Sequence, residues 1–256
     1  MTLLTLAGLT AAAQENNNNN VPAPQPSPEV AAAAAATQPP KPKWETSAGV
    51  GFSLTSGNTD TLLFSANGVA LRKWERNEFA AGFDAGYGKS DGEQNVGYAK
   101  AYSQYNYLIT DRLYAFGRVE GLNDEIADIH YRIPLSAGLG YYLIKNDRVT
   151  LAAETGPGYV WEKVGDDERD YATIRFAERF TWKISDRARF WQSFEYQPKI
   201  DDWAEYFLTG EAGVEADLTK KLALRVVLQD WYVSNPAPGR ESNDLKLVSG
   251  INYKFQ

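Results

Sequence analysis

The chain has 256 residues, a formal net charge of −7, one His, one Met and no Cys. The missing Cys excludes thiol catalysis, disulfide bonds and thiolate metal sites, and the acidic balance disfavours nucleic acid as a partner. No apolar run is long enough for a transmembrane helix. The 15 Tyr, 7 Trp and 21 Gly are instead typical of the strands of an outer-membrane barrel.

Residues 1–13 are apolar and end in small side chains. The pattern Ala11-x-Ala13 before Gln14 predicts cleavage of a signal peptide, although no Lys or Arg precedes Lys41. A short buried helix is the alternative interpretation of this segment.

Residues 14–43 are of low complexity, with an Asn tract followed by a segment rich in Pro and Ala. Such a composition buries too little apolar surface to offset the entropy of ordering. We therefore expect a disordered or extended linker here, most simply a tether.

Residues 44–256 alternate between apolar and polar side chains, which predicts strands and not helices. In 131–143, alternate positions are occupied by Tyr, Ile, Leu and Ala, while polar and small residues lie between them. In 171–184 the apolar face has one exception, Glu178.

Twelve such runs follow one another, and each reaches the roughly 9–11 residues that cross a bilayer when tilted, whereas strands of soluble domains average about 5–6. The predicted fold is therefore an all-β, twelve-stranded, antiparallel, up-and-down transmembrane barrel over 44–256. The expected strands are 45–55, 60–72, 78–89, 95–108, 113–122, 131–144, 149–162, 171–184, 188–198, 203–218, 222–234 and 244–256.

The connections between these runs are predicted to alternate between short periplasmic turns and mostly longer outer loops, as in outer-membrane barrels. The short turns are expected at Lys73–Asn77, Thr110–Arg112, Lys145–Asp147, Ser185–Arg187 and Thr219–Lys221. The longer connections are expected at 56–59, 90–94, 123–130, 163–170, 199–202 and 235–243. A soluble sandwich or a large lipocalin-like barrel is the alternative, which the long strands disfavour.

Trp residues lie near the expected strand ends, as in the aromatic girdles of membrane proteins. Those on the short-turn side are Trp44, Trp74, Trp182 and Trp191, and those on the other side are Trp161, Trp203 and Trp231. Because an unpaired sheet edge is costly in lipid, strand 244–256 is expected to pair with strand 45–55.

The polar face of the strands should point into the lumen of such a barrel, and it carries charges of both signs. Either these charges pair and fill the lumen, or they line a narrow water-filled pore and set its selectivity. The candidates are Asp84, Lys100, Arg118, Glu120, Glu154, Arg175, Arg179, Arg189, Glu195, Glu211, Glu215 and Arg225.

Two further groups suggest chemistry only weakly. The single histidine, His130, lies six positions from Ser136, roughly 20 Å along a strand, which is too far for a nucleophile and its base. The acidic stretch Gly165–Asp170 could bind Ca²⁺, but a solvated charged loop is the simpler interpretation.

The segment Gly51–Thr61, which contains Ser56, Gly57, Asn58 and Thr59, resembles the opening motif of the salt-induced outer-membrane proteins, catalogued as domain of unknown function 481. Residues 108–120, 137–141 and 156–159 extend the resemblance over roughly 44–256. It implies an outer-membrane β-barrel with no established activity. Ser56–Thr59 also has the composition of a tight outer turn.

The sequence thus predicts a non-catalytic envelope protein of the outer membrane, structural or stress-related, with no cofactor and no metal. A narrow channel for ions or small solutes and an outer-membrane lipid-modifying enzyme are the alternatives. Expected partners are outer-membrane lipids, lipopolysaccharide and the barrel-assembly machinery, which reads an aromatic near the C-terminus such as Phe255. The oligomeric state is left open.

Overall fold

The computed structural model describes residues 44–55 and 61–255. The predicted signal segment 1–13, the linker 14–43 and the turn motif Ser56–Thr59 lie outside these residues. Within the described ranges, no helix is long and apolar enough to cross a membrane.

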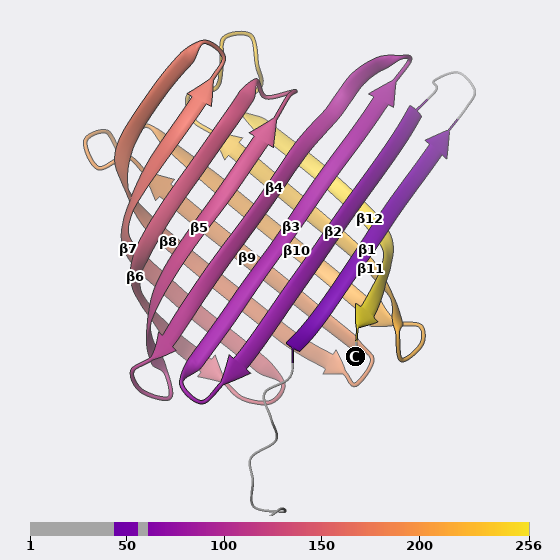
Figure 1. Ribbon diagram of the computed structural model, residues 1–256, viewed down its shortest axis with the longest axis vertical. Coiled ribbons are helices and arrows are strands. Elements are labelled where there is room, and N and C mark those ends of the chain that lie inside the picture. The colour runs from indigo at the N-terminus through magenta and orange to yellow at the C-terminus, as the bar shows by residue number, and fades with distance from the viewer. Residues whose placement is uncertain (1–43, 56–60, 256) are drawn as a thin grey trace, which may run out of the picture. The chain divides into compact units, whose positions relative to one another are not determined.

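Twelve strands in the described residues form one closed antiparallel barrel, in which each strand pairs with its neighbours in the chain (Figure 1). The predicted all-β, twelve-stranded barrel is therefore confirmed. The strands are β1 (Trp44–Thr55), β2 (Thr61–Trp74), β3 (Asn77–Ser90), β4 (Glu93–Leu108), β5 (Leu113–Asp124), β6 (Ile129–Lys145), β7 (Val149–Val164), β8 (Asp167–Ser185), β9 (Ala188–Pro198), β10 (Tyr206–Asp217), β11 (Leu222–Val233) and β12 (Asn243–Phe255).

The barrel closes between β1 and β12, as the sequence predicts. The pairing runs from Thr46 opposite Phe255 to Val50 opposite Ile251, so it covers the part of β1 nearest its start. The closure leaves the sheet without a free edge at this level, because the backbone groups of the first and last strands satisfy each other.

The five predicted short turns lie on one rim of the barrel, the rim at which β1 starts and β12 ends (Figure 1). In four of them a Thr, Asn or Ser side chain accepts the backbone N–H of the residue two positions later. This local bond favours the turn over a continued strand.

A basic residue occupies an equivalent position in all five turns, and its side chain is exposed. The strand that follows each turn pairs with the next strand of the chain. A backbone N–H near the end of that next strand donates a hydrogen bond of 2.7–2.9 Å to the backbone carbonyl of the basic residue. The five residues are Arg76, Arg112, Arg148, Arg187 and Lys221, and their donors are the backbone N–H groups of Leu108, Tyr142, Lys183, Asp217 and Lys254.

The opposite rim differs in part from the prediction of mostly longer connections. Residues 199–205 and 234–242 are indeed long connections, but Asp91–Gly92 and Gly165–Asp166 are two-residue turns. Asp91 and Gly92 have φ of 51° and 84°, the conformation that a tight hairpin requires at both central positions. The rest of the predicted acidic loop belongs to β8, which begins at Asp167 and pairs with β7.

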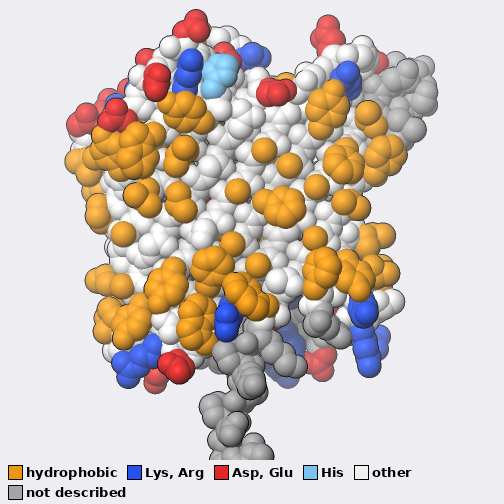
Figure 2. All heavy atoms as spheres, in the orientation of Figure 1, with side chains coloured by type: hydrophobic (Ala, Val, Ile, Leu, Met, Phe, Trp, Pro, Cys, Tyr) orange, Lys and Arg blue, Asp and Glu red, His pale blue; other side chains and the backbone are white. Residues whose placement is uncertain are grey.

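Apolar side chains cover the outside of the barrel, while most charged side chains of the strands face inward. On the face in Figure 2, acidic side chains gather at the top rim, and Lys and Arg gather at the short-turn rim.

Two of the seven Trp residues predicted to form the aromatic girdles do not face outward. Trp191 and Trp231 point into the lumen, where Trp191 donates to Glu211 and Trp231 contacts Tyr98. Each lies one position away from the outward-facing residues of its strand, so strand parity excludes it from a girdle.

We predict that Gly138→Ala destabilises the barrel, because β6 and β7 approach each other too closely for a side chain at this position. An added Cβ would lie 2.1 Å from the carbonyl oxygen of Thr155 and 2.7 Å from the Cα of Gly156. Urea unfolding of the refolded barrel should show a loss of about 1–3 kcal/mol.

Gly117→Ala is the matched control, because an added Cβ there meets no atom within 4 Å. Its unfolding free energy should stay within about 0.5 kcal/mol of the parent. Equal stability of the two variants would contradict a close approach at Gly138.

Candidate functional site

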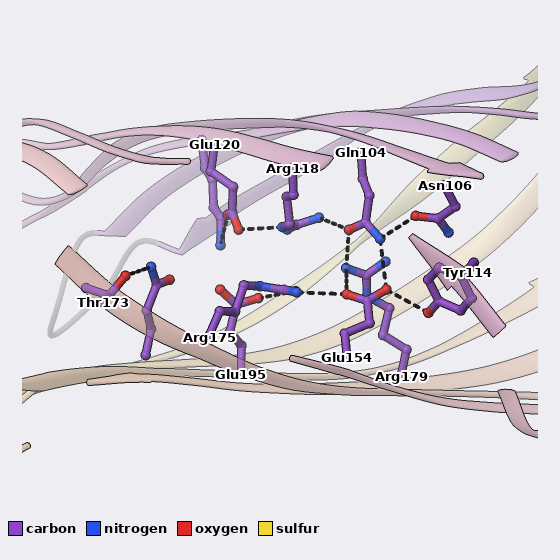
Figure 3. A network of polar contacts seen from close by, with 12 residues as sticks. Gln104, Asn106, Tyr114, Arg118, Glu120, Glu154, Thr173, Arg175, Arg179 and Glu195 are labelled. Atoms are coloured by element: carbon purple, nitrogen blue, oxygen red, sulfur yellow. Dashed lines mark hydrogen bonds and ion pairs between the residues drawn. The ribbon is translucent and has the colours of Figure 1, made fainter. Parts of the chain in front are cut away.

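A network of polar side chains crosses the middle of the lumen, with Glu154 of β7 at its centre (Figure 3). Its Oε1 accepts hydrogen bonds from Gln104 Nε2 at 2.8 Å and from the Tyr114 hydroxyl at 2.9 Å. Its Oε2 accepts from Arg175 at 2.8 Å and from Arg179 at 3.1 Å. Both carboxylate oxygens of Glu154 are therefore fully engaged by side chains from three other strands.

Arg175 of β8 holds two carboxylates together. Its Nη1 lies 2.8 Å from Glu154 and its Nη2 lies 2.7 Å from Glu195 of β9. Only 1% of the Arg175 side chain is exposed. A guanidinium so deeply buried is stable only when its charge is paired, and its planar donors suit two carboxylates at once.

The network continues through Gln104 to the wall formed by β4 and β5. Arg118 donates to Gln104 Oε1 at 3.2 Å and to Glu120 Oε1 at 2.8 Å. Lys100 lies 3.3 Å from the other oxygen of Glu120. Charges of both signs thus alternate across the lumen and largely neutralise one another.

A second cluster lies on the wall formed by β10 and β11. Glu211 accepts from Trp191 Nε1 at 2.6 Å and from Gln229 Nε2 at 3.1 Å, and it lies 3.8 Å from Arg225. Arg225 also donates to Asn67 of β2 at 3.0 Å. This second cluster therefore connects β9, β10 and β11 with β2 through the interior of the barrel.

The two other predicted acidic residues of the lumen are also paired. Asp84 accepts from the Tyr98 hydroxyl at 2.5 Å. Glu215, which is 1% exposed, lies 3.2 Å from Arg189 and 3.1 Å from Lys254.

Two contacts join opposite walls of the barrel near its outer half. The rings of Tyr98 on β4 and Trp231 on β11 meet edge to face, with centroids 5.1 Å apart. Lys246 on β12 lies 3.2 Å from Asp124 on β5 and within 4.1 Å of both ring centroids. The interior is thus filled across its width by an ion pair packed on two aromatic rings.

A further acidic residue, Glu162, binds several side chains at the end of the lumen beside the longer connections. It accepts from Arg132 at 2.5 Å, from Arg169 at 2.7 Å and from the Tyr171 hydroxyl at 3.0 Å. A cavity of about 60 Å³ lies beside Arg132, and the connection 234–242 contributes Ala237, which is 5% exposed, to its wall.

The structure places all twelve charged candidates on inward-facing strand positions and brings seven of them into the central network around Arg175. Residue type and strand parity were enough to find them. The uncharged members Gln104 and Tyr114 and the outer pair Arg132 and Glu162 were missed, although their strand parity places them inward as well. Whether the charges set a selectivity stays a prediction.

The structure does not bring His130 and Ser136, the weaker candidates for catalysis, together. The His130 ring lies 3.9 Å from Asp128 at the rim, whereas Ser136 is a buried residue further along β6. Within residues 44–55 and 61–255, no group of three or more His, Cys, Asp or Glu side chains is placed to hold a metal ion.

Solved structures that resemble the barrel include the NanC porin, the KdgM porin and the translocator domain of the autotransporter NalP from Neisseria meningitidis. Their sequence identities are 10%, 8% and 11%, and their TM-scores are 0.47, 0.45 and 0.45. The alignments cover 82%, 84% and 89% of this chain and 96%, 100% and 93% of those chains. Similarities this weak say nothing about what this chain does.

No curated protein matches the sequence. One family model does, over residues 48–255, and its description is "Protein of unknown function, DUF481". This range contains the whole barrel, including all of β12, except for the first four residues of β1. The chain therefore belongs to the DUF481 family of outer-membrane β-barrels.

Proposed function

We propose that this protein resides in the bacterial outer membrane, with its five short turns in the periplasm. Its strands are long enough to cross a bilayer and their outward faces are apolar, which supports this location. The short-turn rim is the one that outer-membrane barrels place in the periplasm. A signal peptide in residues 1–13 fits the same proposal.

We further propose that the barrel is a structural, non-catalytic envelope protein whose lumen is closed by paired charges. The observation that carries this proposal is the burial of Arg175 between Glu154 and Glu195 in the middle of the lumen. A water-filled pore would instead hydrate these groups. Pairs that are buried are screened little by salt, so such a lumen would stay closed at high ionic strength, which suits a role under salt stress.

The partners we propose are the lipids around the barrel and lipopolysaccharide. The outer rim carries Asp128, Asp166, Asp201, Asp202 and Glu241 in its connections. Lipopolysaccharide is itself anionic, so this rim would meet it through bridging divalent cations.

A narrow ion channel is the second candidate. It is favoured by Arg179, whose side chain is 33% exposed although it contacts the buried Glu154. A change of its rotamer would leave the central network partly hydrated. A lipid-modifying enzyme has less support, since His130 and Ser136 lie apart.

We predict that the purified barrel gives no stable conductance steps in planar bilayers, because the paired charges leave no continuous water path. The variant in which Arg175 and Arg179 are both replaced by Gln should conduct, if it folds. Steady steps in the parent, with an ion selectivity that changes in this variant, would support the channel and overturn the closed lumen.

We also predict that Arg175→Met lowers the free energy of unfolding by about 3–5 kcal/mol, because Glu195 loses its ion pair and the buried Glu154 loses one of its two. Unfolding in urea, followed by heat-modifiable migration in gels, measures this loss. In the control Lys183→Met, the pair with Asp186 is exposed, so the change should be about 0–1 kcal/mol. A lumen that is open and hydrated would make the two losses similar.

A further inference from the structure

The outward face of β8 has a carboxylate in the middle of its apolar run. Phe180, Trp182 and Ile184 lie on one side of Glu178, and Phe176, Ile174 and Ala172 lie on the other. Phe176 and Trp182 are 38% and 43% exposed, so this face is turned away from the lumen. The residue that broke the alternation of the sequence thus lies within the apolar surface of the barrel.

A second polar residue, Gln192, accompanies Glu178 on the neighbouring strand β9. Gln192 also faces outward, between Phe190 and Phe194, and its Nε2 donates a hydrogen bond of 3.0 Å to Glu178 Oε2. The two residues are called the outer polar pair below. In the described residues no ion pair is formed by Glu178, and the cations of β8 lie on its luminal face.

This outer polar pair is costly if only lipid covers it. A carboxyl group and an amide that face hydrocarbon lose hydration without full replacement, and charged residues on the lipid face of a barrel destabilise it most near the midplane. One bond between them leaves Glu178 Oε1 and the second amide hydrogen of Gln192 without a partner on this surface. A polar partner from another molecule would satisfy both.

The outward surface beside the outer polar pair contains a groove. It has a volume of about 540 Å³, and its lining includes Glu178, Leu139, Tyr141, Phe194 and Ala153. Aromatic side chains beside a small residue suit close packing of another side chain.

We propose that this surface is the interface between two copies of this chain in the membrane, related by a two-fold axis beside the outer polar pair. A second copy is the partner whose chemistry fits without further assumptions. Under two-fold symmetry, the free hydrogen of Gln192 in each copy faces Glu178 of the other, so two reciprocal hydrogen bonds form. The inference rests on the proposed membrane location of the barrel.

The test compares the parent with the double variant Glu178→Leu, Gln192→Leu, which keeps the outward face apolar. The mass of each protein in mild detergent is measured by light scattering over a series of concentrations. The parent should be a dimer, and the variant should dissociate at a concentration about tenfold higher or more, because two interchain hydrogen bonds are lost.

The matched control is Asp230→Leu, Ser249→Leu, which replaces two outward-facing polar residues on β11 and β12, outside the groove and away from the outer polar pair. Its dimer should dissociate as the parent does. A monomeric parent, or a dimer that the Glu178 variant does not weaken, would overturn the proposal.

Cross-linking identifies the partner, because the natural chain contains no Cys. Phe194→Cys should form a disulfide-linked dimer in native membranes, whereas Leu224→Cys, which faces outward on β11 two strands away, should not. A cross-link from Phe194→Cys to a different protein would overturn the second copy as partner. Heat-modifiable migration is recorded for every variant, so a protein that does not insert as a barrel shows the failure of the membrane proposal separately.

Discussion

The structure depends on one requirement, that every backbone N–H and C=O group in the barrel wall has a partner within the wall. In hydrocarbon, each unpaired group costs several kcal/mol, and only a sheet that closes on itself avoids a free edge. The pairing of β1 with β12 meets this requirement at the short-turn end. Closure then assigns one face of every strand to the outside and the other to the interior, and all further features follow from that division.

The interior is filled by groups that would be unstable there alone. Glu154, Arg175 and Glu162 are almost fully buried, and each is held by two or more partners of opposite charge or complementary hydrogen-bonding capacity. Glu154 of β7 also accepts hydrogen bonds from Gln104 of β4 and Tyr114 of β5, so these bonds join strands that backbone hydrogen bonds do not pair. Removing one partner of such a buried pair is therefore strongly destabilising, because the other partner is left buried without compensation.

Strand positions and inward charges could be predicted because both depend on a period of two. The period places Arg175 inward and Phe176 outward regardless of anything else in the fold. The pairing of Arg175 with Glu195 as well as Glu154 could not be predicted, because it depends on the tilt of the strands and on rotamers. The tight turn at Gly165–Asp166 was missed for a related reason, since the charges of Asp167–Asp170 resemble a loop although the ladder with β7 continues through them.

One contact is repeated in all five turns of the short-turn rim: the backbone carbonyl of a basic residue accepts a hydrogen bond from the end of a neighbouring strand. A hairpin with this turn could therefore be duplicated or deleted without redesign of its neighbours, and the circumference would change by two strands at a time. The barrel is in this sense modular, and wider or narrower relatives need differ only in how many such hairpins they contain.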